Sequence, residues 1–115
     1  MSKGELEDKI SKLLSRWEKD YLGRGSLVVK TDILRNMVIV VLKGVLTPAE
    51  EKLVVTQEGL MAIKRMRSDL VESGVDHLYS LVEEATGTKV TSFFTDISTR
   101  SGERVMVFMM DSSLD

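Results

Sequence analysis

The first part of the chain has the apolar spacing of an amphipathic helix. Its apolar residues recur at steps of three and four, which places them on one helical face: Leu6, Ile10, Leu13, Leu14, Trp17 and Tyr21. Ser2 and Glu5 have the spacing of a capping box, which starts a helix. Gly23 and Gly25 end it, because glycine readily adopts the left-handed conformation that closes a helix.

Two pairs of β-rich segments predict two hairpins. The first pair is residues 26–33 and 37–43, and the second is residues 89–98 and 103–110. All four are rich in β-branched and other apolar residues and are bounded by turn formers. The first connection includes Asn36, which tolerates a positive φ in a tight turn.

The second strand of each hairpin has apolar residues at both odd and even positions, and these two sets point to opposite faces. We therefore expect both faces of the strand to be covered. A single helix layer covers only one face, which predicts a second subunit on the other. The predicted interface, and with it a homodimer, uses one parity of each strand: Met37, Ile39, Val41, Met106, Phe108 and Met110.

Residues 47–86 read as helical. Thr47 caps the helix, Pro48 takes its first position and Glu50 completes a capping box. The helix either bends at residues 56–59 or stops and restarts there with Thr56 as a new cap. From Gln57 the apolar spacing continues as one long helix of about 43 Å at 1.5 Å per residue, longer than the sheet requires. We expect part of it to project toward a partner subunit.

The order of elements repeats. Thr31-Asp32-Ile33 and Thr95-Asp96-Ile97 lie 64 positions apart, and at this offset Gly23 aligns with Gly87. We therefore expect one α+β domain, residues 1–115, with an internal pseudo-repeat of residues 1–46 and 47–111 (αββ-ααββ). Its two hairpins form a four-stranded antiparallel sheet with the helices packed on one face.

Composition narrows the class of protein. The 115 residues contain no cysteine, which excludes disulfides and thiolate metal sites. The net charge of −2 gives no global field that would favour nucleic acid. No apolar run approaches the roughly 20 residues of a membrane helix, and the N-terminus does not resemble a signal peptide. We expect a cytoplasmic protein that is not inserted in a membrane.

Two aspartates in equivalent strands are the most notable polar positions. Asp32 and Asp96 could flank a shared groove as a ligand site or a carboxylate pair. Alternatively, each caps its own hairpin turn. Arg100, with Arg104 nearby, could contact an anion from the tip of the second hairpin.

Other polar groups point less clearly to a site. His77 is the only histidine and lacks the companions of a zinc site. The basic residues Lys64, Arg65 and Arg67 read as a solvated helix face rather than a nucleic-acid surface. No phosphate loop, nucleophile elbow or metal motif is present, so we expect no metal, no cofactor and no catalytic residues.

Three segments resemble a bacterial family of unknown function: Leu46-Thr47-Pro48-Ala49-Glu50, residues 84–90 and Asp96-Ile97-Ser98-Thr99 with Gly102-Glu103. Members of that family are about this long, and some are labelled as subunits of a sodium-translocating decarboxylase. This chain has no biotin-attachment motif. The genes of some members resemble inorganic-carbon uptake genes in their setting, which implies an accessory or regulatory role.

These observations favour a non-enzymatic oligomer that binds a partner protein or a small ligand. One alternative is a small enzyme that uses the carboxylates of Asp32 and Asp96. The other alternative is a nucleic-acid-binding protein.

Overall fold

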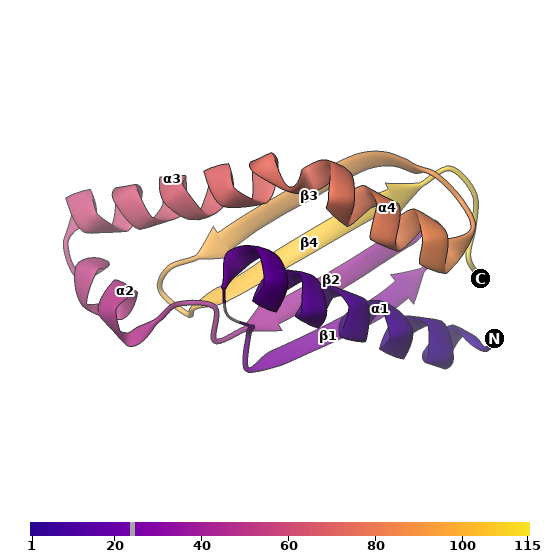
Figure 1. Ribbon diagram of the computed structural model, residues 1–115, viewed down its shortest axis with the longest axis horizontal. Helices are drawn as coiled ribbons and strands as arrows, with labels where there is room; N and C mark the ends of the chain where they lie inside the picture. Colours follow the sequence, from indigo (N-terminus) through magenta and orange to yellow (C-terminus); the bar gives the residue numbers. More distant parts are fainter. Residues whose placement is uncertain (24) are drawn as a thin grey trace.

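The computed structural model describes residues 1–23 and 25–115 as two helix–hairpin units in sequence (Figure 1). The elements are α1 (Lys3–Trp17), a π-helical turn η1 (Glu18–Leu22), β1 (Val28–Leu34), β2 (Met37–Lys43), α2 (Pro48–Leu53), α3 (Gln57–Ser73), α4 (Val75–Thr86), β3 (Val90–Ser98) and β4 (Glu103–Met110).

Side-chain caps start the helices where the sequence predicts them. At α1 the backbone N–H of Glu5 donates to Ser2 Oγ at 3.1 Å, within a complete capping box. The same motif starts α2 at Thr47, with Pro48 in the first turn. Thr56 caps α3, so the chain stops after α2 and restarts.

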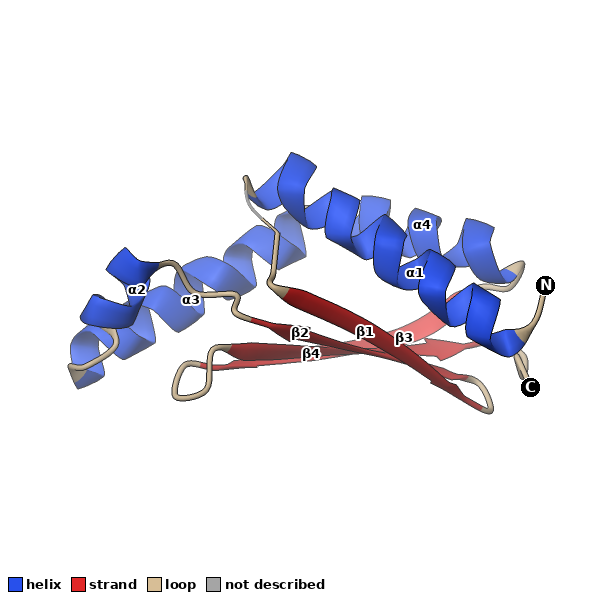
Figure 2. Ribbon diagram, turned by 90° about the horizontal axis from the view of Figure 1, so that it is seen from below, coloured by secondary structure: helices blue, strands red, loops and turns tan. Residues whose placement is uncertain are grey.

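The four strands form one antiparallel sheet in the order β1-β2-β4-β3. Helices α1 and α4 lie over one face of this sheet, whereas no helix of residues 1–23 and 25–115 lies over the opposite face (Figure 2). The predicted α+β fold, with helices on one side of a four-stranded antiparallel sheet, is confirmed.

The core lies between the sheet and the two helices. Strand β4 contributes Met106, Phe108 and Met110, each no more than 1% exposed. We predicted these three residues at a subunit interface, but they point to the helices. The physical reason is parity: β4 is apolar on both faces, and the helices cover the face that carries these residues. The facing helices and β2 supply much of the rest of the core: Ile10, Leu14, Trp17, Val38, Val40, Leu42, Leu78 and Val82.

The long helix expected over residues 57–86 is two helices, α3 and α4, which break at Gly74. A Cβ at Gly74 would lie 2.7 Å from the ring of Tyr21 and 3.1 Å from that of Trp17. These two rings stack with centroids 5.4 Å apart, and Tyr21 also hydrogen-bonds Ser73. The C-terminal part of α1 and η1 therefore packs directly on the break.

The break lets α3 leave the sheet. Helix α2 and the N-terminal half of α3 extend past the ends of the strands (Figures 1 and 2). The molecule measures 44 × 23 × 23 Å as a result.

Replacing Gly74 with alanine tests this packing. Alanine is normally preferred to glycine in helices, but here its methyl group would overlap Tyr21. We expect Gly74→Ala to lower the free energy of unfolding by about 1–3 kcal/mol, as overpacking does, measured by urea denaturation. The control is Gly4→Ala in α1, where a Cβ has nothing within 4 Å; equal stability of both variants would contradict the account.

Candidate functional site

The described helices leave the other face of the sheet uncovered (Figure 2). We call it the open face. Its centre is formed by alternate residues of the two inner strands, and apolar edge residues extend it: Val28, Leu34, Met37, Ile39, Val41, Phe94, Val105, Val107 and Met109. Phe94 is 61% exposed and Val105 is 39% exposed, although both are apolar.

Strand register arranges the open face in four rows that run across the sheet. In order from β1 to β3, the rows are Leu34–Met37–Met109–Ser92, Asp32–Ile39–Val107–Phe94, Lys30–Val41–Val105–Asp96 and Val28–Lys43–Glu103–Ser98. The first three rows are apolar at the centre, and charged residues stand at the edges of the second and third rows. The fourth row, at one end, carries a lysine beside a glutamate.

Asp96 is at the β3 edge, where its carboxylate has two partners. Oδ1 accepts a hydrogen bond from the backbone N–H of Ile97 at 2.8 Å and lies 3.4 Å from the ammonium group of Lys64. The bond from Ile97 lowers the pKa of Asp96, partial burial opposes this, and Lys64 lowers the pKa further. Asp96 is therefore a fixed negative charge on the rim of the open face.

Asp32 lies on the opposite edge of the same face. Three strand spacings of about 4.8 Å separate β1 from β3, and the two aspartates lie one row apart, so they stand on the order of 16 Å apart. At that distance they can neither share a proton nor bind one cation. The two carboxylates predicted as a ligand site flank the open face, but the structure does not bring them together.

The arginines of the second hairpin also separate. Arg100 is exposed in the turn, whereas Arg104 is buried on the helix side, where its Nη1 donates to Thr95 Oγ1 at 2.9 Å. Burial lowers the pKa of Arg104, and the like charge of Arg67 lowers it further. The two arginines do not form a shared anion site at the hairpin tip.

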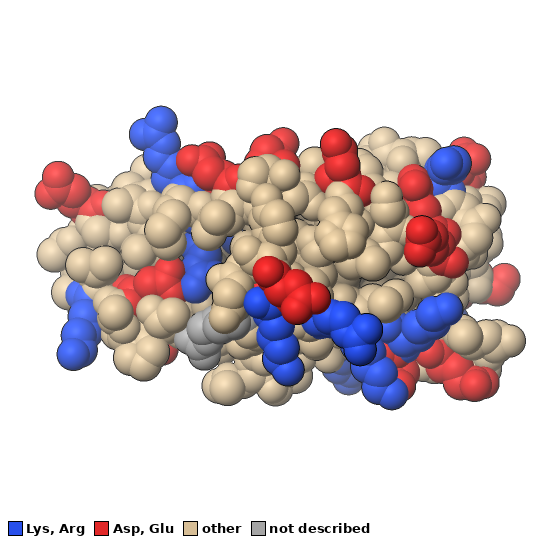
Figure 3. Space-filling view, in the orientation of Figure 1, with Lys and Arg blue, Asp and Glu red and all other residues tan. Residues whose placement is uncertain are grey.

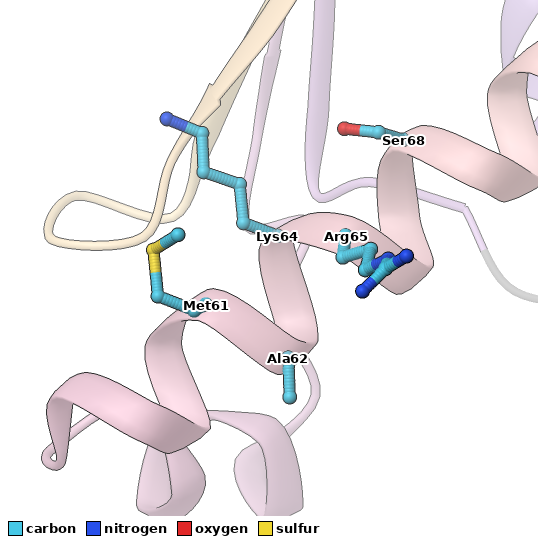
Figure 4. Close-up of a pocket in the computed structure, with 5 residues that line it drawn as sticks. All are labelled: Met61, Ala62, Lys64, Arg65 and Ser68. Carbon is cyan, nitrogen blue, oxygen red and sulfur yellow. The ribbon is translucent and has the colours of Figure 1, made fainter.

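No constellation of groups that could hold a metal ion occurs in residues 1–23 and 25–115. His77 is exposed on α4. A hollow of about 390 Å³ lies on the surface of α3, and all its lining residues come from this one helix. Figure 4 shows Lys64 reaching from there toward the strands, while Arg65 points elsewhere. The hollow therefore lacks the convergent groups of a catalytic pocket.

The basic residues of α1 are diluted by acidic neighbours. On the helix side of the molecule, the two kinds of charge intermingle (Figure 3). Lys12, for example, pairs with Asp8 at 2.9 Å. This surface lacks the continuous positive stripe that a nucleic-acid binder presents.

A buried ion pair that sequence reasoning missed holds α3 in place. Arg67 Nε donates to Glu50 Oε2 at 3.0 Å, and Arg67 Nη2 donates to Glu50 Oε1 and to the carbonyl oxygen of Val45. Both side chains are only 11% exposed. We predicted Arg67 on a solvated face; its spacing of four residues from Ile63 and Val71, which are both buried, was the signal for burial. The pair therefore holds α3 in place, and Lys64 of α3 reaches the rim of the open face.

The strength of the ion pair between Glu50 and Arg67 depends on pH, because Glu50 must be charged to form it. Burial raises the pKa of Glu50, but hydrogen bonds from Arg67 and from the backbone N–H of Thr47 outweigh it, so the pKa lies below its ordinary value of 4.5. The carboxylate is therefore charged in the folded state at neutral pH.

Comparison with known proteins establishes the family. Residues 2–112 match the model described as "Na+-translocating membrane potential-generating system (MpsC)". The chain belongs to the MpsC family. It is 57% identical over 114 residues to the uncharacterized protein YbcI of Bacillus subtilis, with 99% of this chain and 92% of that protein covered. It is 30% identical over 116 residues to the uncharacterized protein YrhF of the same organism, with 96% and 88% covered.

No solved structure gave a significant match. The family assignment agrees with the resemblance to a bacterial family of unknown function, and the MpsC description shares the words on sodium translocation. Within residues 1–23 and 25–115, no helix combines the length and apolar character needed to cross a bilayer.

Neutralising Glu50 tests the buried pair. We expect Glu50→Gln to lower the free energy of unfolding by about 3 kcal/mol at pH 7, because the Arg67 charge stays buried without its counter-ion. Since the folded pKa of Glu50 is depressed, its contribution is fully present above pH 4.5 and is lost as the pH falls through the folded pKa. The stability gap between the two proteins should therefore narrow below pH 4.5, as followed by urea denaturation at several pH values. The control is Asp8→Asn, which disrupts the exposed pair with Lys12 and should leave the unfolding midpoint unchanged. A difference in stability between Glu50→Gln and the unchanged protein that stays constant on acidification would contradict the role given to the buried pair.

Proposed function

We propose that this member of the MpsC family is a cytoplasmic, non-enzymatic accessory module that works as a homodimer joined through the open face. The observation that carries the proposal is the row of apolar side chains on the two central strands with no element over them. Seven residues per strand at about 3.3 Å and three strand spacings of about 4.8 Å give a surface of about 23 by 14 Å before side chains are added. The apolar side chains at its centre form a contiguous patch, and such patches often mark interaction sites.

The arrangement of titratable groups supports a non-enzymatic role. Asp32 and Asp96 lie on opposite edges of the sheet, and Asp96 is engaged by Ile97 and Lys64. General acid–base catalysis needs its groups within hydrogen-bond reach of a common substrate. In this proposal the two aspartates and Arg100 act as surface charges, not as ligands of a small molecule.

The fold also supports a duplicated origin for the domain of residues 1–115. Each hairpin occupies one half of the sheet, and the second strand of each lies at the centre, where β2 pairs with β4. An interface built on the two second strands uses both repeats, residues 1–46 and 47–111, equally.

The family description supplies the setting. It names a Na+-translocating, membrane potential-generating system, and translocation itself requires elements that span the membrane. We propose that this chain serves such a system as an accessory protein that binds a protein partner, while the open face holds its own two subunits together.

A charge at the centre of the open face tests the homodimer. Val107→Lys places an ammonium group in the second row, and its long stem still covers the sheet. We expect the unchanged protein to sediment at twice the 12.9 kDa chain mass and Val107→Lys to sediment as a monomer at the same concentration. The control is Val55→Lys in the connection between α2 and α3, beyond the ends of the strands (Figure 1), where the native side chain is 81% exposed; this variant should remain dimeric. A monomer for the unchanged protein at all concentrations would refute the proposal.

A further inference from the structure

The charges along the four rows of the open face specify how a second copy would sit. When two such faces meet, the twofold axis lies in the plane between them. The axis can run parallel to the strands or across them, and packed sheets keep their strands within about 30° of alignment in either case. The two directions superpose different rows, so they bring different charges together.

When the axis is parallel to the strands and lies between β2 and β4, each row of one subunit lies over the same row of the second copy. The residues of the two rows then run in opposite order. The row Lys30–Val41–Val105–Asp96 then places Lys30 of one subunit over Asp96 of the other, twice per dimer. In the fourth row, Lys43 meets Glu103 of the second copy. The apolar centres also match, with Met37 over Met109 and Ile39 over Val107.

With the axis across the strands, the first row meets the fourth and the second meets the third, so Lys30 would lie over Asp32 of the second copy. Lys43 would then lie over Met37 and Glu103 over Met109, which buries two charges per subunit against apolar side chains. The parallel axis gives four opposite-charge contacts per dimer, two in the third row and two in the fourth, whereas the crossed axis gives only the two between Lys30 and Asp32. Charge complementarity therefore favours the parallel axis. In the parallel arrangement Asp32 meets Phe94 at the rim, where its carboxylate keeps contact with water.

The angle between two twisted, packed sheets does not disrupt the pairing of Lys30 with Asp96. The edge strands lie about 7 Å from the axis, so a tilt of 30° displaces an edge residue by about 4 Å. That is less than the spacing of about 7 Å between rows on one face, and a lysine side chain spans the difference.

We infer that the occupant of the open face is a second copy of this chain, related by a twofold axis parallel to the strands and held in register by ion pairs between Lys30 and Asp96 of opposite subunits. The inference rests on the proposed homodimer. Asp96 then lies between Lys64 of its own subunit and Lys30 of the other. The rim charge that α3 orients becomes the contact that selects the partner.

The test is a charge-swap experiment on full-length protein. Lys30→Glu alone places two glutamate–aspartate contacts in each homodimer, and Asp96→Lys alone places two lysine–lysine contacts there. We expect each variant to weaken self-association at least about tenfold, because opposed like charges are unfavourable. An equimolar mixture restores opposite charges at both contacts, so it should form a heterodimer with a dissociation constant within about threefold of the unchanged protein.

Sedimentation velocity gives the dissociation constants, and native mass spectrometry with one variant labelled with ¹⁵N identifies the heterodimer. Circular dichroism melting shows whether each variant is folded. If Asp96→Lys does not fold, the pair Lys43→Glu and Glu103→Lys offers a second swap with the same expectation. The controls are Lys9→Glu and Glu84→Lys, which make the same charge changes at exposed helix positions and should leave the dimer intact.

The outcomes separate the two proposals. An unchanged protein that never dimerises refutes the homodimer itself, including the case in which another protein covers the open face. A dimer that Lys30→Glu weakens but Asp96→Lys does not refutes the parallel axis. A dimer that neither swap affects joins through another surface and also overturns the inference.

Discussion

A four-stranded sheet with apolar side chains on both faces needs two covering layers, and this chain supplies helices for one. Helices α1 and α4 enclose the core of Trp17, Phe108 and their neighbours. On the other side, Ile39 and Val107 pair across the central strands with nothing over them. Burial of apolar area contributes roughly 25 cal/mol per Å², so this open face is the strongest unused source of association energy in the described structure. The other proposals follow from it.

The second constraint concerns the helix that does not cover the sheet. Gly74 separates α3 from α4, which lets α4 lie on the sheet while α3 continues past its end. The buried pair of Arg67 with Glu50 anchors α3 to α2 and to the carbonyl of Val45. This anchoring brings Lys64 beside Asp96 at the edge of the open face. A buried polar network thus sets the electrostatics of a surface that is otherwise apolar.

Local signals in the sequence were enough to predict the helix starts, the two hairpins and the fold class. The caps at Ser2 and Thr47 depend on residues only three positions apart, and the hairpins depend on short β-rich runs, so neither needs tertiary information. The break at Gly74 was not predicted, because the apolar spacing runs through it. The ring of Tyr21, which lies far away in sequence, leaves no room for a side chain at this position.

The open face could be predicted only in part. Met37, Ile39 and Val41 lie on it as expected, but in β4 the alternate set, Met106, Phe108 and Met110, lies in the core. A strand that is apolar at both parities does not reveal which face meets the helices. The face of β4 that lies in the core also carries a charged residue, the buried Arg104. Only the pairing register, which places Val107 opposite Ile39, resolves the choice.

The most direct test of a covered open face is the access of solvent to its methyl groups. A soluble paramagnetic probe enhances the relaxation of exposed methyl groups in NMR spectra, and the protein concentration sets the fraction of dimer. We expect the methyl groups of Ile39, Val41 and Val107 to be protected at high concentration and to become exposed on dilution. Those of Val38 and Val40, which are 0% exposed in one subunit, should stay protected throughout. Open-face methyl groups that are equally accessible at every concentration would contradict the account.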